Sequence, residues 1–222
     1  MKTMAGKLLT MILLAWLIGL WCGLPGHATL PLALPQDTLA GLIPGINTVA
    51  DASRLYGVYD VRLPGDYLAY AGGSYATNAY RWTTGTNGKV PGLIVETAIG
   101  SPRIDAVVVD EYPGLPTANG LMALDPEQRV IQLYGLPDYA YELYFGGDLD
   151  FRELFYVNRG LLVVLEQMNG RMSWMVSRLV LTYPTYLRNA VAVRTRAVSL
   201  GPVVTDITDS YQVWVRAIEK RP

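Results

Sequence analysis

Residues 48–57 read TVADASRLYG, and residues 125–135 read DPEQRVIQLYG. Both stretches end in Leu-Tyr-Gly, and the two endings lie 78 positions apart. A repeat of this spacing decides how the whole chain is divided, because each copy predicts one unit of supersecondary structure.

Each of these stretches has the features of a short helix. A capping box is available at both starts, from Thr48 with Asp51 and from Asp125 with Gln128. Pro126 suits the first helical position, and the final glycine of each stretch can adopt the left-handed conformation that ends a helix. Because a helix of two turns is unstable alone, each one predicts a sheet on which it packs.

The segments after each helix also recur, as short runs rich in Val, Ile, Tyr and Trp between Gly, Asn and Pro turns. Such runs are typical of antiparallel strands. The matching pairs of segments are 66–73 with 138–147, 79–82 with 154–157, 92–95 with 160–163, and 104–109 with 175–181. We therefore predict an α+β fold of two tandem units, each a short helix plus about four antiparallel strands. The pattern leaves open whether the two sheets fuse into one.

A partial third unit is predicted at the C-terminus, because residues 195–211 resemble the start of the second copy. In this interpretation residues 213–216 form one closing strand, and the alternative is an irregular hairpin over 203–218. The predicted divisions of the chain are 1–28 (signal peptide), 29–37 (extended lead-in), 38–113 (first unit), 114–186 (second unit) and 187–222 (partial third unit).

The first 28 residues have the composition of an export signal. Residues 1–7 carry two lysines, residues 8–24 are apolar and uncharged, and residues 25–28 supply a helix breaker and small residues. We expect cleavage after Ala28 and a mature protein in the periplasm or an equivalent extracytoplasmic lumen, with no stable membrane insertion. An uncleaved N-terminal membrane anchor and a lipoprotein modified at Cys22 are the alternatives.

Removing 28 of the 222 residues would leave 194 without cysteine or histidine, since Cys22 and His27 are the sole residues of these types. Histidine acid/base chemistry, cysteine nucleophiles, disulfides and ordinary zinc sites would then be excluded. Lys2 and Lys7 would also leave, so that 16 basic residues face 19 acidic ones and the net charge is −3. This charge argues against nucleic-acid binding. We expect no catalytic residues, no metal and no cofactor.

The repeated stretch resembles the small tandem α+β repeats of the β-lactamase inhibitor protein and of the SmpA/OmlA outer-membrane lipoproteins. The resemblance lies in residues 117–121, in the helix ending and proline of 133–137, and in the Arg-Gly-Leu turn of 159–161. It implies an exported, non-catalytic protein with a protein partner in the cell envelope. This chain has neither the lipobox of the lipoproteins nor the disulfide cysteines of the inhibitor, so the resemblance does not identify the partner.

Tyrosine dominates the aromatic residues, with 15 Tyr against 3 Phe and 5 Trp. Tyrosines interleaved with Gly, Ser, Thr and Asn are typical of protein-binding surfaces. We expect the segments 64–82 and 137–152 to form one binding face, although half of these side chains could alternate into the core. The predicted partner-binding residues are Tyr67, Tyr70, Tyr75, Tyr80, Trp82, Tyr139, Tyr141 and Tyr144.

Two other functions use the same parts of the sequence. Flat aromatic side chains also stack on sugars, so a carbohydrate-binding module is one alternative. The carboxylates Asp148, Asp150 and Glu153 lie together after two glycines, and paired carboxylates can hydrolyse glycosidic bonds or hold calcium. A solvated acidic turn is the simpler interpretation of this cluster. The oligomeric state does not follow from the sequence.

Overall fold

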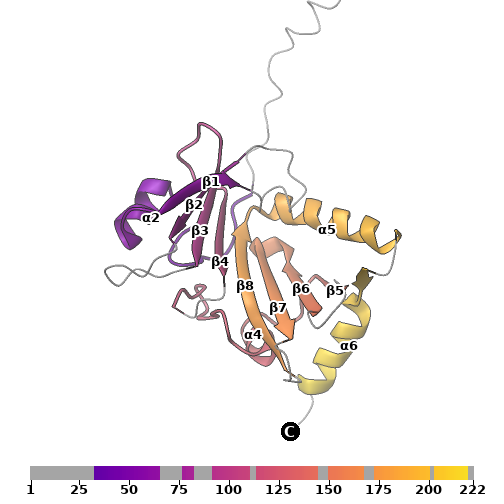
Figure 1. Cartoon of the computed structure of the whole chain (residues 1–222). Helices are drawn as coiled ribbons and strands as arrows, with labels where there is room; N and C mark the ends of the chain where they lie inside the picture. The colour runs from indigo at the N-terminus through magenta and orange to yellow at the C-terminus, as the bar shows by residue number, and fades with distance from the viewer. Residues whose placement is uncertain are drawn as a thin grey trace, which may run out of the picture. The chain divides into compact units, whose positions relative to one another are not determined.

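The computed structural model describes residues 33–65, 77–82, 92–110, 114–144, 150–167, 173–200 and 203–219 (Figure 1). All of them belong to one unit that starts at Ala33. Among these residues, none of the helices combines the length and the apolar character that crossing a bilayer requires.

Nine strands form a single antiparallel sheet in the order β1-β2-β3-β4-β8-β7-β6-β5-β9. The fold is therefore mixed helix and strand, as predicted, with sheet as its larger part. The strands are β1 (Val61–Gly65), β2 (Thr77–Trp82), β3 (Leu93–Ala98), β4 (Ala106–Asp110), β5 (Tyr139–Tyr144), β6 (Asp150–Tyr156), β7 (Leu161–Gln167), β8 (Trp174–Thr182) and β9 (Val204–Asp206).

Two four-stranded meanders, β1 to β4 and β5 to β8, meet in the middle of this sheet. Their last strands pair with each other, and Val108 lies opposite Val180 at the centre of the β4–β8 register. The sheets thus fuse into one, which answers the question that the sequence left open. Because β4 and β8 pair with each other, neither of them is an exposed edge of the sheet.

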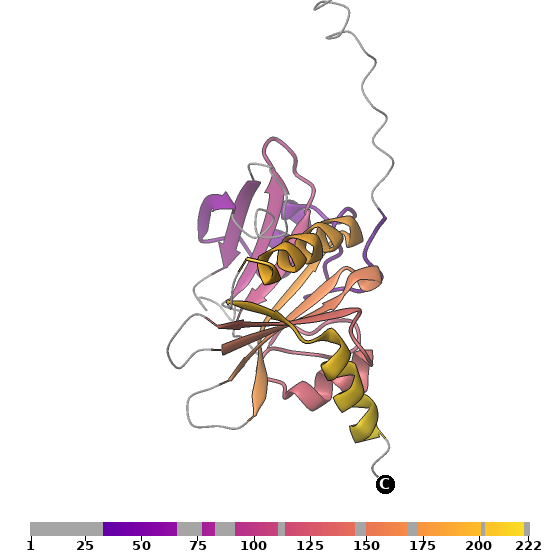
Figure 2. The same cartoon turned by 90° about the vertical axis from the view of Figure 1, so that its right-hand side faces the viewer.

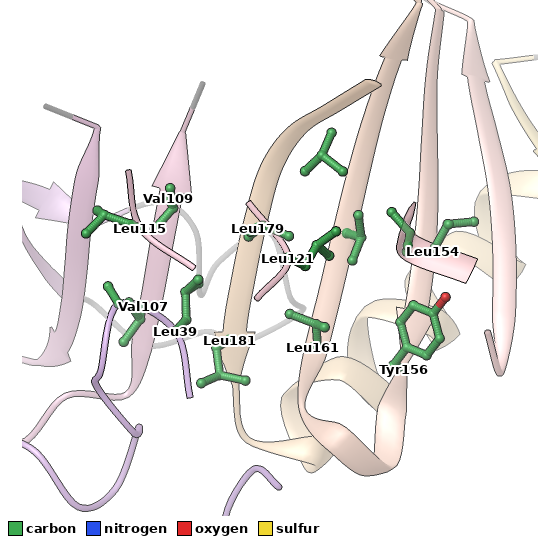
Figure 3. Packing of buried hydrophobic residues seen from close by; sticks show 14 of the residues in the cluster. Leu39, Val107, Val109, Leu115, Leu121, Leu154, Tyr156, Leu161, Leu179 and Leu181 are labelled. Carbon is green, nitrogen blue, oxygen red and sulfur yellow. The ribbon is translucent and has the colours of Figure 1, made fainter. Parts of the chain in front are cut away.

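Four α-helices pack on the sheet in the described part of the chain, and a short 3-10 helix, η2 (Val157–Arg159), precedes β7. Helices α2 (Val49–Tyr56), α4 (Glu127–Tyr134) and α6 (Thr208–Glu219) contribute buried residues to one apolar cluster. Figure 3 shows strand and loop members of this cluster. Helix α5 (Pro184–Val198) contributes Leu187, Ala190 and Val191 to the cluster on the opposite face (Figure 2). Both faces of the sheet are therefore buried, which explains its nearly continuous Val and Leu runs.

The two predicted short helices are present. Thr48 and Asp51 form the expected capping box of α2, with their side chains each accepting a backbone N–H of the other residue. The capping box predicted for the second helix is wrong: Pro126 is the N-cap and offers no side-chain bond. The carboxylate of Asp125 instead accepts the backbone N–H of Met122 at 2.8 Å, inside the preceding turn.

The predicted closing strand over residues 213–216 is also wrong, because these residues lie in α6. Tyr211 and Val215 are buried four positions apart, and this spacing matches one face of a helix rather than the alternation of a strand. The sequence-based prediction did not include α5. Its start is marked by Pro184 at the first helical position, and its buried residues recur at helical spacing.

Glycine is required at the turn between η2 and β7. Gly160 has φ of 71°, and a Cβ at this position would collide with the backbone carbonyl oxygen of Thr182. The close approach allows the backbone N–H of Thr182 to donate to the Gly160 carbonyl at 2.8 Å. The turn therefore fixes the start of β7 against the end of β8.

Candidate binding site

The predicted partner-binding residues differ in their exposure. Tyr67, Tyr70 and Tyr75 lie outside the described residues. Trp82 and Tyr141 have no exposed surface, and their side chains pack in the two apolar clusters. Apolar clusters cover both faces of the sheet, so side chains on either face of a strand can be buried: Trp82 lies in the cluster of α2, α4 and α6, and Tyr141 lies in the cluster of α5.

Three of the predicted residues reach the surface. Tyr80 is half-buried and makes an edge-on contact with Tyr59, with ring centroids 4.8 Å apart. Tyr139 and Tyr144, at the two ends of β5, are each 41% exposed. Their role as binding residues stays a prediction.

The structure does not bring the described members of the two Tyr-rich segments together. Strands β3, β4, β8 and β7 lie between β2 and β6 in the sheet. With strands about 4.8 Å apart, the two segments are more than about 20 Å from each other across the sheet. A single continuous binding face over both segments is therefore not present among the described residues.

A pocket of about 640 Å³ lies between α4, α6 and the strands β5, β6 and β8. Its lining includes two carboxylates and one guanidinium, from Glu127, Glu142 and Arg152. Three aromatic side chains, Trp174, Tyr211 and Trp214, and several small polar ones complete it. Pockets of this size that combine aromatic walls with a few polar groups are typical of binding sites.

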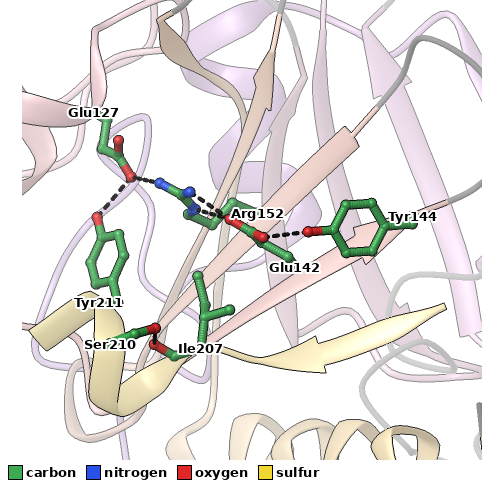
Figure 4. A network of polar contacts seen from close by, with 7 residues as sticks. All are labelled: Glu127, Glu142, Tyr144, Arg152, Ile207, Ser210 and Tyr211. Atoms are coloured by element: carbon green, nitrogen blue, oxygen red, sulfur yellow. Dashed lines mark hydrogen bonds and ion pairs between the residues drawn. The ribbon is translucent and has the colours of Figure 1, made fainter. Parts of the chain in front are cut away.

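Arg152, on β6, lines the pocket and lies at the centre of its polar network (Figure 4). Its Nη1 donates to Oε1 of Glu127 at 2.5 Å, and its Nε and Nη2 donate to Oε1 of Glu142 at 3.1 and 2.5 Å. The sheet sets the second pair, because Glu142 on β5 lies directly opposite Arg152 in the register. Two hydroxyl groups extend the network: Tyr211 donates to Glu127 at 2.9 Å and Tyr144 to Glu142 at 2.6 Å.

Aromatic rings enclose the same guanidinium. Its carbon lies 4.4 Å from the centroid of the Trp174 ring and 5.3 Å from that of Tyr211. Both distances are within the range of cation–π attraction. Trp214 packs on Tyr211 with centroids 5.4 Å apart and is 41% exposed, so it forms the outer wall of the pocket.

Interactions within the pocket keep Glu142 ionised and keep the side chains of Arg152 and Tyr211 protonated. Burial alone would raise the pKa of Glu142, but the hydrogen bonds from Tyr144 and Arg152 outweigh it and leave this pKa below its usual value. Burial would lower the pKa of Arg152, yet the charges of Glu127 and Glu142 raise it. Burial, followed by the charge of Glu127, raises the pKa of Tyr211, so this phenol remains a hydrogen-bond donor.

The acidic cluster considered for hydrolysis or calcium binding is not assembled among the described residues. Asp148 lies outside them, and Asp150 is half-buried at the start of β6. Glu153 is buried on the opposite face of the sheet from Arg152, where Arg194 of α5 donates to both of its carboxylate oxygens, at 2.7 and 2.9 Å. The described residues include no group of three or more acidic, His or Cys side chains suited to a metal ion.

Sequence reasoning missed most of the pocket. Of the predicted residues, Tyr144 alone takes part in its network, and Glu127, Arg152, Trp174 and Trp214 were not singled out. The one available signal was the helical spacing of Ser210, Tyr211 and Trp214 after Ile207, which would have predicted α6.

No protein-family model, no curated protein and no solved structure matches this chain, so the predicted family resemblance stays a hypothesis.

Proposed function

We propose that this chain is an exported, non-catalytic protein that binds another protein of the cell envelope, and that the pocket beneath α6 is its binding site. The observation that carries the proposal is the set of Trp174, Tyr211, Trp214 and Arg152 in one pocket. Trp, Tyr and Arg are the residues most enriched among those that dominate the binding energy of protein interfaces.

Apolar surface beside the pocket supports a macromolecular partner. Val213 of α6 is 69% exposed and lies next to Trp214 in the chain. A pocket with an apolar rim suits a partner that inserts one side chain and rests its neighbours on the rim.

The state of the charged groups supports binding rather than catalysis. Each of Glu127, Glu142 and Arg152 is engaged in an ion pair inside the pocket. A general acid or base needs a pKa near the working pH, whereas the interactions of Glu142 lower its pKa and those of Arg152 raise it. The pKa of Glu142 and the pKa of Arg152 thus both shift away from neutral pH, so both groups stay charged.

Export is proposed from the N-terminal sequence. The basic, apolar and small-residue parts of residues 1–28 support a cleaved signal and a location in the periplasm or an equivalent lumen. An uncleaved membrane anchor at the N-terminus remains the alternative.

We also propose that residues 38–113 and 114–186 are tandem copies of one unit, with the last part of the chain as an addition to the second. Equivalent hydrogen bonds support this. Trp82 Nε1 donates to the Gly57 carbonyl at 2.8 Å, and the Tyr156 hydroxyl donates to the Gly135 carbonyl at 3.0 Å. Both glycines follow the Leu-Tyr that ends a helix.

Reciprocal contacts between the copies support the same proposal. The backbone N–H of Ala40 donates to the Pro116 carbonyl, and that of Ala118 donates to the Thr38 carbonyl, both at 3.0 Å. Positions 38 and 116, and positions 40 and 118, are 78 apart, which is the spacing of the two Leu-Tyr-Gly endings. Exchanging the copies therefore exchanges these two bonds, as expected for a pseudo-twofold arrangement.

Carbohydrate binding is the second candidate function. The exposed ring of Trp214 beside Gln128 and Ser210 favours it, because an aromatic face with neighbouring amide and hydroxyl groups can hold a sugar. A pull-down on peptidoglycan would test this candidate directly.

Partner capture tests the protein-binding function. The tagged chain is crosslinked in its native envelope and purified, and the captured protein is quantified for Trp214→Ser and for Leu55→Ser. Leu55 of α2 is 59% exposed and apolar, and it lies outside the pocket, so its replacement is the matched control. Loss of the Trp214 contact should reduce capture about tenfold or more.

The control should capture as much partner as the unchanged chain, and circular dichroism should show that both variants fold. Equal capture by the two variants would contradict the proposed site. Retention on peptidoglycan that depends on Trp214, without a captured protein, would favour the carbohydrate-binding function instead.

A further inference from the structure

The pocket beneath α6 carries an excess of negative charge. Its lining among the described residues holds two carboxylates against one guanidinium, and its other side chains are neutral. The side chains of Glu127, Glu142 and Arg152 are 8%, 17% and 14% exposed, so water screens these charges only weakly. One negative charge is therefore left without a counter-charge in the pocket.

One carboxylate oxygen in the pocket also has free hydrogen-bonding capacity. Oε1 of Glu127 accepts from Arg152 and Tyr211 (Figure 4), whereas no hydrogen bond to Oε2 is found among the described residues. Glu127 is 7% exposed. Oε2 is not one of the described buried side-chain atoms that lack a partner, so it is open to solvent in the pocket. A carboxylate oxygen that water can reach can also accept a hydrogen bond from a donor that enters the pocket.

The walls of the pocket suit the same kind of ligand. Trp174, Tyr211 and Trp214 present aromatic rings within the lining, and rings of this kind attract a cation over their faces. Arg152 already occupies such a position between Trp174 and Tyr211. An anionic ligand would have to displace one of the two carboxylates from Arg152, which disfavours phosphate or carboxylate ligands.

We propose that the pocket takes the cationic end of a lysine or arginine side chain from the partner protein, which donates to Oε2 of Glu127 and packs against Trp214. That the cation belongs to a protein rests on the proposed protein-binding function. Recognition of a cation by the pocket can be tested without any partner. Charge complementarity is its main argument, since the incoming charge neutralises the excess carboxylate.

The test uses two capped amino acids that differ in charge and hardly in shape. N-acetyl-arginine N-methylamide is the cationic probe, and the citrulline counterpart is its neutral isostere. The chain is labelled with fluorotryptophan and followed by fluorine NMR during titration with each probe. Trp82 is fully buried and outside the pocket, so its resonance is an internal control.

We expect saturable shifts of the Trp174 and Trp214 resonances with the arginine probe at millimolar concentrations and none for Trp82. The citrulline probe should bind about tenfold more weakly or worse. Equal response to both probes would overturn the inference, and so would saturation by a neutral oligosaccharide without a response to arginine.

A matched pair of variants locates the site. Glu127→Gln should abolish the difference between the two probes, because it removes the excess negative charge and keeps the shape of the side chain. Glu166→Gln changes a half-buried glutamate outside the pocket and should leave the difference unchanged. An unchanged preference for arginine in Glu127→Gln would overturn the assignment to this carboxylate. If Glu127→Gln fails to fold, the comparison of the two probes on the unchanged chain still decides whether the pocket prefers a cation.

The outcomes separate this inference from the proposed function. A strong preference for the arginine probe without any captured protein would mean that the ligand is a free guanidine or amine. The cation site would then stand, and the proposal of a protein partner would fail. A captured partner whose binding survives replacement of every lysine and arginine in its contact segment would remove the cation site and retain protein binding.

Discussion

Replacing Arg194 by leucine should lower the free energy of unfolding by about 3–5 kcal/mol, because the change leaves a buried carboxylate without its counter-charge. Arg194 of α5 donates through Nε and Nη2 to the two oxygens of Glu153, and both residues are buried, at 8% and 2% exposed. Chemical denaturation followed by circular dichroism measures the effect.

The double variant Arg194→Leu with Glu153→Leu is the control for this prediction. It removes both charges and fills the space with apolar side chains, so most of the lost stability should return. A single variant as stable as the unchanged chain would contradict the buried ion pair between β6 and α5. A double variant no more stable than the single one would show that Arg194 acts through its packing instead.

Alkaline pH should unfold the protein cooperatively. Burial raises the pKa of four tyrosines, Tyr134, Tyr156, Tyr183 and Tyr211, and for Tyr183 it raises the pKa to about 12. An unfolded chain releases these protons near pH 10. Since the folded-state pKa values are raised, their contribution to stability is complete below pH 10 and is lost as the pH rises through the folded values.

For each tyrosine the loss should amount to about 1.4 kcal/mol for each pH unit between 10 and its folded-state pKa. Four tyrosines together then exceed the stability of a typical domain within about two to three units. The part of the tyrosinate absorbance that comes from the buried tyrosines should appear in the same transition as the loss of the circular dichroism signal. Tyr156→Phe should move this transition to higher pH, whereas Tyr139→Phe, at an exposed site, should not. Ionisation of all the tyrosines near pH 10 with an unchanged circular dichroism signal would contradict the prediction.

The elements with strong local signals could be predicted from the sequence. Thr48 and Asp51 define a helix start that needs no tertiary partner, and the Val-rich runs in β3, β4, β7 and β8 allow few alternatives to buried strands. Helix α6 was missed because Val213, Trp214 and Val215 are good strand formers in sequence. Their helical state follows from the burial of Tyr211 and Val215 against α4 and the sheet.

The pocket could not be predicted because its members come from five elements. Arg152 meets Glu142 through the pairing of β5 with β6, and it meets Glu127 only because α4 packs on the same face of the sheet. Neither contact is encoded by short-range spacing. The Tyr-rich segments were a weaker guide, since alternation along the strands sends Trp82 and Tyr141 into the core and leaves Tyr144 at the surface.

Site-specific photo-crosslinking tests most directly whether the partner binds at the pocket beneath α6. One crosslinking residue replaces Gln128, and another replaces Ala50. Both are exposed second residues of eight-residue helices, α4 and α2, but Gln128 alone lines the pocket. In the native envelope we expect one specific protein adduct from position 128 and none from position 50. An adduct from position 50 with none from position 128 would contradict this expectation.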